Sequence, residues 1–285
     1  MHTKVYSDMD MYNLQNTFFA VYNFFKYYVR ITVINREAAM LDTSQFTYVD
    51  GKRGRIGLIT PAPGSSTEWE FNHYKPEDVA VLTTRVPLFG ISYAGIVEMM
   101  TYVDQAAKML ADSSVVDLIL FSCTAGSFLE GGQYDEQLAD HLQELTGIPC
   151  TTTSSCVRKA LSVLGIRRLH VVTPYSASVN DLEKAFLESN GITVLSISGA
   201  LLDRSQNTPK IPAEIMAGYA READTSDADA MFISCTGLHV DSLIVPLEKE
   251  LGKPVITSNQ CGLWGALRML GIKDRIPELG TLFSY

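Results

Sequence analysis

Two copies of one short phrase, FSCTAG at residues 121–126 and ISCTGL at residues 233–238, decide how this chain folds. Each follows a run of apolar residues, Val115 to Phe121 in one case and Ala230 to Ile233 in the other. Such runs are typical of strands that are buried on both faces. Each phrase places a thiol, a hydroxyl and a glycine where the strand gives way to the next helix. The repetition predicts two similarly built regions with a cysteine at the same point of each.

Four landmarks recur in the same order in the two halves of the chain. They are a Thr-Pro pair at 60–61 and 173–174, the Ser-Cys-Thr triplets, a Gly-x-Pro at 147–149 and 252–254, and the stretches ALSVLGIR at 160–167 and ALRMLGIK at 266–273. Their separations run from 105 residues, between Pro149 and Pro254, to 113 residues, between Pro61 and Pro174. A repeat of this length is much longer than the period of a solenoid and indicates duplication of a domain-sized unit.

Strand-like and helix-like patterns alternate along most of the chain. Strands are expected at 55–60, 115–121, 169–172, 193–197, 230–234 and 255–257 and just after Pro149, and helices at 91–110, 131–146, 154–164, 179–190, 212–223, 242–251 and 263–270. This alternation predicts an α/β fold of two pseudo-symmetric Rossmann-like domains with parallel sheets. Ligands of such sheets bind beyond the carboxyl ends of the strands, so we expect the active site in the cleft between the domains. The expected division is an N-terminal extension at 1–48, a first domain at 54–166 plus 262–285, and a second domain at 167–261.

The bulk composition narrows the range of partners. A net charge of −9 over 285 residues argues against nucleic acid, whose phosphates need a basic surface. An anionic substrate would therefore be held by local donors. The aromatic stretch from Phe18 to Ile34 is interrupted by Asn23, Lys26 and Arg30, so we expect no membrane span there. The segment 1–48 could be an extra helix and strand, a contact in a homo-oligomer, or a dispensable extension.

The chain has five cysteines and no CxxC pair, which fits free thiols in a reducing cytoplasm. Cys150, Cys156 and Cys261 are interpreted as small buried apolar residues. Cys123 and Cys235 are the candidate catalytic residues. A helix that starts just after each of them should lower the pKa of its thiol and make it reactive.

A reactive thiolate can add to an electrophilic carbon or remove a proton from a carbon beside a carboxylate, while a second thiol donates a proton from the other side. Both reactions build negative charge on the carboxylate, and that charge needs donors already in place. Candidate donors at the strand ends are the backbone N–H groups after each cysteine and the hydroxyls of Ser65, Ser66, Thr124, Tyr175 and Thr236. Helix capping is the alternative for the aliphatic hydroxyls, and a place on a surface loop is the alternative for Tyr175. His239 could tune Cys235 or could be a partly exposed helix residue.

The glycine-rich stretch GSFLEGG at 126–132 lacks the lysine and the spacing of a phosphate-binding loop. No dinucleotide fingerprint follows the first strand, and no Cys/His cluster has zinc spacing. The sequence therefore predicts no nucleotide, flavin or metal cofactor.

Over residues 54–275 the chain resembles the aspartate/glutamate racemase superfamily, and within it the branch of maleate isomerases and arylmalonate decarboxylases. The resemblance rests on GIPCTTT at 147–153, ISCTGL at 233–238 and LGKPVITSNQ at 251–260. It implies cofactor-independent chemistry by two cysteines between two similar α/β domains, with Tyr175 binding the substrate carboxylate. Together with the donors expected at the strand ends, the predicted substrate-contacting set is Pro61, Ser65, Ser66, Thr124, Ala125, Tyr175, Thr236 and Gly237.

Departures from the family patterns guide the choice of reaction. Thr124-Ala125 stands where amino-acid racemases have Asn-Thr, and Cys123 stands where arylmalonate decarboxylases have glycine. Gly64 replaces an asparagine of the maleate isomerase loop, and His239 replaces a frequent arginine. The resemblance implies an isomerase of a small dicarboxylate, similar to maleate cis–trans isomerase. A racemase or decarboxylase that works through an enediolate, and a non-catalytic carboxylate-binding protein, remain the alternatives.

Overall fold

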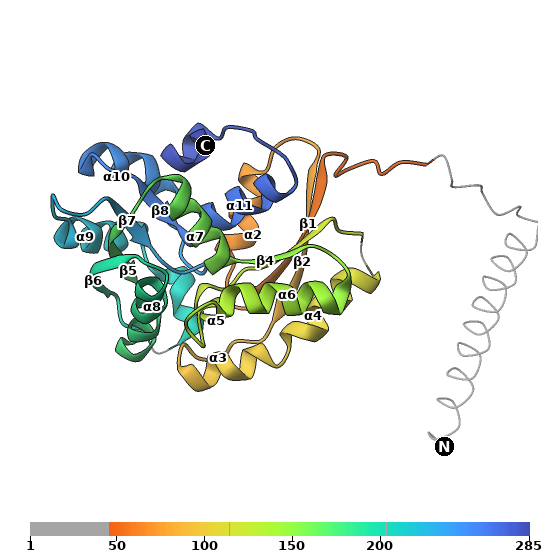
Figure 1. The fold of residues 1–285 in the computed structure, drawn as a ribbon, viewed down its shortest axis with the longest axis horizontal. Coiled ribbons are helices and arrows are strands. Elements are labelled where there is room, and N and C mark those ends of the chain that lie inside the picture. The colour runs from red at the N-terminus through yellow and green to blue at the C-terminus, as the bar shows by residue number, and fades with distance from the viewer. Residues whose placement is uncertain (1–45, 114, 203) are drawn as a thin grey trace, which may run out of the picture. The chain divides into compact units, whose positions relative to one another are not determined.

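The computed structural model describes residues 46–285 apart from 114 and 203. Residues 48–285 form one compact unit that contains two four-stranded sheets (Figure 1). The sheet of the first half has the strand order β2-β1-β3-β4, and that of the second half has the matching order β6-β5-β7-β8, with parallel pairing throughout. The strands are β1 (Gly54–Pro61), β2 (Val79–Val86), β3 (Leu118–Phe121), β4 (Cys150–Thr152), β5 (Arg168–Thr173), β6 (Thr193–Gly199), β7 (Ala230–Ile233) and β8 (Val255–Thr257).

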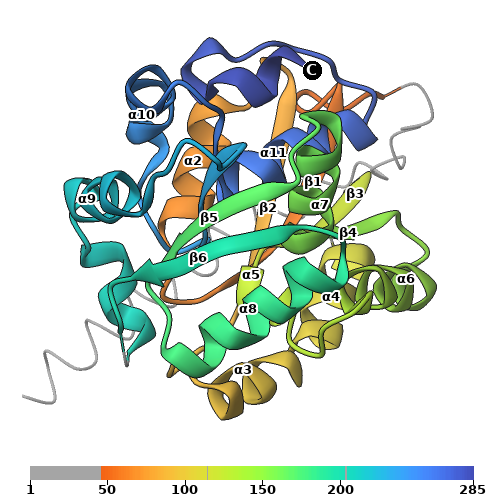
Figure 2. The same ribbon diagram turned by 60° about the vertical axis from the view of Figure 1, so that its left-hand side comes forward.

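Helices cover both sheets, and α7 and α11 pack against each other between the halves (Figures 1 and 2). The α-helices are α2 (Ser66–Tyr74), α3 (Tyr93–Met100), α4 (Val103–Ser113), α5 (Thr124–Ser127), α6 (Tyr134–Thr146), α7 (Thr153–Val163), α8 (Ala177–Ser189), α9 (Ala213–Ala223), α10 (Ile244–Leu251) and α11 (Ser258–Met269). Four short 3-10 helices are η1 (Ser205–Lys210), η2 (Asp241–Leu243), η3 (Pro277–Leu279) and η4 (Thr281–Ser284). The predicted two-part α/β fold with parallel sheets is confirmed.

The apolar runs before the two cysteines became strands at the centre of their sheets. Every residue of β3 and of β7 is buried, as the continuous apolar sequence predicted. The chain leaves both strands in the same way, because Ser122 N–H donates to Ile59 O at 2.7 Å and Ser234 N–H donates to Val172 O at 2.8 Å. The duplication seen in the sequence is therefore present in the backbone at the point where each cysteine follows.

Two elements of the first half, α2 and β2, were missed in the sequence. The buried face of α2 carries Ser66, Thr67 and Glu70 beside Phe71, so it shows no apolar stripe of helical period. The edge strand β2 has the mixed sequence VAVLTTRV and is only partly buried.

Some helix boundaries also differ from expectation. The helix expected over 91–110 is two helices, α3 and α4. The helix expected from Gly131 begins only at Tyr134, because Gly131 and Gly132 have φ of +71° and +55°, outside the helical region.

We propose a division into a first domain at 54–166 plus 262–285 and a second at 167–261, although α11 runs unbroken across residue 261. The extension at 1–48 lies almost wholly outside the described residues. Within the described part of the chain, no helix combines the length and the apolar character needed to cross a bilayer.

Candidate active site

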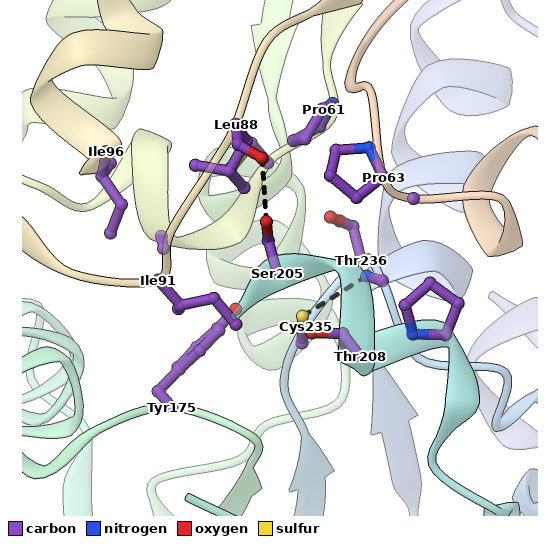
Figure 3. Close-up of a pocket in the computed structure, with 15 residues that line it drawn as sticks. Pro61, Pro63, Leu88, Ile91, Ile96, Tyr175, Ser205, Thr208, Cys235 and Thr236 are labelled. Atoms are coloured by element: carbon purple, nitrogen blue, oxygen red, sulfur yellow. Dashed lines mark hydrogen bonds between the residues drawn. The ribbon is translucent and has the colours of Figure 1, made fainter. Parts of the chain in front are cut away.

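Both repeated cysteines line one cavity between the carboxyl ends of the two sheets. Figure 3 shows Cys235 in this cavity. The cavity has an accessible volume of about 40 Å³. Cys123 lies two residues beyond β3, and Cys235 lies two residues beyond β7. The parallel topology explains this meeting, because both loops leave their sheets at the carboxyl edge.

The two thiols are held differently. Cys123 has an extended backbone, φ −149°, and caps α5: Gly126 N–H donates to its Sγ at 3.4 Å. Cys235 has φ +151°, a value that side-chain-bearing residues rarely adopt, and Gly237 N–H donates to its Sγ at 3.3 Å. No regular helix begins directly after Cys235, so the expected equivalence of the two thiols at helix starts is only partial.

The expectation of lowered thiol pKa values is wrong for the ligand-free site. Burial raises the pKa of Cys123 to about 12 and that of Cys235 to about 11. The N–H groups of Gly126 and Gly237 favour the thiolates, but they offset only part of the lost hydration. Helix α5 has four residues and so contributes little dipole. Proximity to Cys235 also raises the pKa of Cys123, so ionisation of one thiol opposes ionisation of the other.

Tyr175 reaches the cavity from the turn after β5. Its N–H donates to Thr173 Oγ1 at 3.1 Å, and its side chain is buried next to Cys235 (Figure 3). Burial raises the phenol pKa well above its ordinary value, so the hydroxyl keeps its proton. The same hydroxyl lowers the pKa of Cys235, in opposition to burial. Tyr175 can therefore donate a hydrogen bond to a thiolate or to a carboxylate oxygen in the cavity.

Most of the site residues that were predicted from the sequence line the cavity. These are Pro61, Cys123, Ala125, Tyr175, Cys235, Thr236 and Gly237. The other three direct their hydroxyls elsewhere. Ser65 Oγ lies 3.1 Å from His239 Nε2, Ser66 Oγ donates to Thr236 O at 2.6 Å, and Thr124 Oγ1 donates to Ser258 Oγ at 2.9 Å.

The sequence did not predict the apolar side of the cavity. Leu88, Ile91 and Ile96, from β2–α3, supply apolar surface, and η1 of the second half closes against them (Figure 3). Ser205 Oγ donates to Leu88 O at 2.8 Å and joins these segments. Because the lining comes from loops without a motif, only the apolar spacing around residue 91 could have suggested it. The remaining lining residues are Pro63, Gly64, Thr208 and Pro209.

The cavity lining described by the structure contains no Lys, Arg or His. A carboxylate there would be held by neutral donors, namely hydroxyls and main-chain N–H groups. Across residues 46–113, 115–202 and 204–285, no three His, Cys, Asp or Glu side chains gather as metal ligands would.

An α/β fold with paired thiols at the carboxyl ends of two parallel sheets defines the class to which the chain belongs. The chain is a member of the arylmalonate decarboxylase family, whose model matches residues 56–283. This membership confirms the resemblance to the branch of maleate isomerases and arylmalonate decarboxylases in the aspartate/glutamate racemase superfamily.

Relatives of both activities are similar over most of the chain. Arylmalonate decarboxylase of Bordetella bronchiseptica is 29% identical over 236 residues, covering 80% of this chain and 96% of that protein. Maleate isomerase of Nocardia farcinica is 26% identical over 239 residues, covering 80% and 94%. A structure of a Nocardia farcinica maleate isomerase with a covalently bound succinylcysteine intermediate shares the fold, with a TM-score of 0.78, 22% identity and coverage of 81% and 98%.

Proposed function

We propose that this chain is a cofactor-independent isomerase that interconverts the cis and trans forms of a small dicarboxylate with two cysteine thiols. The observation that carries the proposal is that Cys123 and Cys235 line one small cavity. Family membership supports it, as does the cysteine–substrate bond in the Nocardia farcinica structure, a succinylcysteine. Binding alone would not require two thiols on one substrate, which disfavours a purely carboxylate-binding role.

In this reaction the thiolate of Cys123 forms a bond to one carbon of the double bond. The electron pair of the double bond moves toward the neighbouring carbon and its carboxylate, which becomes enediolate-like, and Cys235 gives its proton to that carbon. Rotation about the new single bond follows. Cys235 then takes a proton back, the double bond re-forms in the trans arrangement, and the Cys123 thiolate leaves. In the ligand-free site both thiols keep their protons, so Cys123 must lose its proton before it adds to the substrate. The mutual opposition of the two ionisations then keeps Cys235 protonated as the proton donor.

The substrate-contacting roles are likewise proposals. Tyr175, Thr236 and the main chain at Ala125 and Gly237 would hold the reacting carboxylate, and Pro61 would shape the cavity. Ser65, Ser66 and Thr124 would act on the substrate indirectly, because their hydroxyls form hydrogen bonds that hold the loops of the site. The donors are neutral hydroxyl and N–H groups in a buried site. They interact most strongly with the negative charge that builds up on the reacting carboxylate, so they stabilise the transition state more than the ground state.

A second function is favoured by the apolar side of the cavity. Leu88, Ile91 and Ile96 offer no donor to a second carboxylate, whereas they suit an alkyl or aryl group on the reacting carbon. A racemase or decarboxylase of an α-substituted acid uses the same enediolate and the same thiols. In that reaction one thiolate takes the α-proton, or carbon dioxide leaves, and the other thiol protonates the opposite face.

Proton NMR in deuterated buffer separates these functions. The full chain is incubated with maleate, with a single enantiomer of a 2-arylpropionate, and with a 2-aryl-2-methylmalonate. Formation of fumarate supports the proposed isomerase. Deuterium entry at the α-carbon, or release of carbon dioxide, would replace it by the second function. Saturable binding of all three acids without turnover would leave only a binding protein and contradict both.

A further inference from the structure

The backbone at Cys235 has a φ angle that residues with a side chain rarely adopt, so neighbouring groups must hold it. Its φ of +151° contrasts with −149° at Cys123, the matching residue of the first half. A residue with a Cβ keeps such a value only where its surroundings over-determine it. The hydrogen bonds around the two cysteines differ accordingly.

The carbonyl of Thr236, one residue after Cys235, lies among three donors. Ser66 Oγ is 2.6 Å away, Thr67 Oγ1 is 3.0 Å away and Asn259 Nδ2 is 3.2 Å away. All three side chains are buried, with exposed fractions of 3% or less. The carbonyl oxygen has two lone pairs for these groups, and Thr67 has one hydroxyl proton to give either to it or to Asn259 Oδ1, so the acceptor is fully used and its direction is fixed.

The orientation of the Asn259 amide is set by its own neighbours. Its Nδ2 donates to Glu70 Oε1 at 2.8 Å as well as to Thr236 O, and its Oδ1 lies 2.9 Å from Thr67 Oγ1. Burial raises the pKa of Glu70 well above its ordinary value, but the carboxyl oxygen accepts the amide proton in either ionisation state. The side chain of Asn259 therefore cannot turn without losing partners on both sides.

The same helix holds the other side of Cys235. Ser258 and Asn259 open α11, and the N–H of Cys235 donates to Ser258 Oγ at 3.0 Å. Cys235 is thus fixed at its own N–H and at the next carbonyl by two adjacent residues of one helix, while Ser66 and Thr67 are supplied by α2 of the first half.

The duplicated half provides an internal comparison. Ser154 of α7 occupies the position that Asn259 occupies in α11, and its Oγ approaches Thr124 O at 3.4 Å, beside Ser127 Oγ at 3.0 Å. Both of these donors belong to the first half itself. No residue of the second half is among the donors to Thr124 O that the structure describes. Among the described residues, side-chain donors from the other half therefore reach the carbonyl after the cysteine with the unfavourable φ, but not the matching carbonyl of Thr124.

We propose that Ser66, Thr67 and Asn259 are positioning residues that hold the Thr236 carbonyl and so aim the Cys235 thiol at the cavity. This inference rests on the proposed function only in taking Cys235 as a reacting thiol. Because Ser66 and Thr67 belong to the first half of the chain, the first half helps to fix the thiol of the second half.

The test removes the two hydroxyls in the double variant Ser66→Ala/Thr67→Val and follows both thiols separately by iodoacetamide alkylation and peptide mass spectrometry. Release of the loop should speed alkylation of Cys235 severalfold and leave Cys123 within about twofold, because only the former loop loses its donors. With the substrate identified by NMR, kcat should fall by about tenfold to a hundredfold while KM changes little, since the thiol is misplaced and binding groups are kept.

Matched variants separate positioning from general loosening. Thr67→Ser keeps the hydroxyl and should behave as wild type, and Ser154→Ala should leave Cys235 alkylation unchanged. If the double variant does not fold, Asn259→Ser provides the same comparison. Unchanged Cys235 alkylation, or an equal rise at Cys123 and Cys235, would overturn the inference. Because alkylation needs no substrate, this result is independent of whether maleate is turned over.

Discussion

The Thr124 hydroxyl donates to Ser258 Oγ at 2.9 Å, and that oxygen also accepts the main-chain N–H of Cys235 at 3.0 Å. One buried serine thus connects the residue after the first thiol with the backbone of the second. The loops that carry Cys123 and Cys235 are therefore joined by hydrogen bonds as well as lining the same cavity.

Ser258→Ala should damage both loops at once. It leaves the Cys235 N–H and the Thr124 hydroxyl without their acceptor, and each unmet buried donor costs about 1–3 kcal/mol of unfolding free energy. Urea unfolding measures the loss, and turnover should fall with it. Ser258→Thr keeps the hydroxyl and copies Thr153, the matching residue of the first half, so it should retain most of the stability. Equal losses in both variants would argue that the hydroxyl is irrelevant.

Thiol reactivity should be governed by pH well above neutrality. With pKa values near 12 for Cys123 and 11 for Cys235, the thiolate fraction of each rises about tenfold per pH unit between pH 7 and 10. Alkylation rates of the ligand-free protein should rise in parallel. The substitution Cys235→Ser should shift the pH profile of Cys123 alkylation to lower pH, because it removes a neighbouring group that opposes ionisation of Cys123. A profile that is flat from pH 6 to 8 would show that the thiols are already ionised.

Glu183 should make the protein less stable as pH rises from acid to neutral. It is buried, Ser234 Oγ donates to its Oε1, and its Oε2 lacks a partner within the described part of the chain. Burial raises its pKa from 4.5 to about 8. Between these values the folded state keeps a proton that the unfolded chain releases. Stability attributable to this group therefore falls by about 1.4 kcal/mol per pH unit and levels off above pH 8.

Glu183→Gln removes that dependence. Chemical unfolding at pH 5 and at pH 8 should show a variant that gains stability relative to wild type as pH increases. The glutamine oxygen can still accept from Ser234, so the packing contact is conserved. A difference between variant and wild type that does not change with pH would mean that Glu183 is ionised in the folded protein.

Gly64 offers a way to change substrate preference. A Cβ built there would lie 3.4 Å from Pro61 O, an ordinary contact, and the residue lines the cavity without a positive φ. Gly64→Asn should introduce a donor for a second carboxylate and lower KM for maleate about tenfold. Gly64→Ala, which adds bulk without a donor, is the control. Equal KM values for the two variants would show that the side chain at residue 64 does not reach the substrate.

The sequence could predict the parts of the fold whose burial is apolar. The runs before Cys123 and Cys235 identified the central strands, and the spacing of the repeated landmarks identified two halves. Helix α2 was not predicted because it buries Ser66, Thr67 and Glu70, which form hydrogen bonds with the other half. Its buried face therefore shows no apolar residues at helical spacing.

The site was predictable in its location but less so in its details. Strand ends indicated where Thr124 and Tyr175 would lie, but not that Thr124 turns to Ser258 while Tyr175 faces the cavity. The thiol pKa values depend on burial, which no local motif encodes. The apolar side formed by Leu88, Ile91 and Ile96 is assembled by tertiary packing.

Intact-protein mass spectrometry with maleate tests the central claim, that two thiols act on one carboxylate substrate. In Cys235→Ser, Cys123 can still add to maleate and water can supply the proton that Cys235 normally gives, whereas the return step lacks its base. A covalent adduct with the mass of one substrate should therefore accumulate on the peptide that contains Cys123. Cys123→Ser should form no adduct, and both variants should lose turnover. Undiminished turnover in either variant, or an adduct that forms without Cys123, would contradict the two-thiol account.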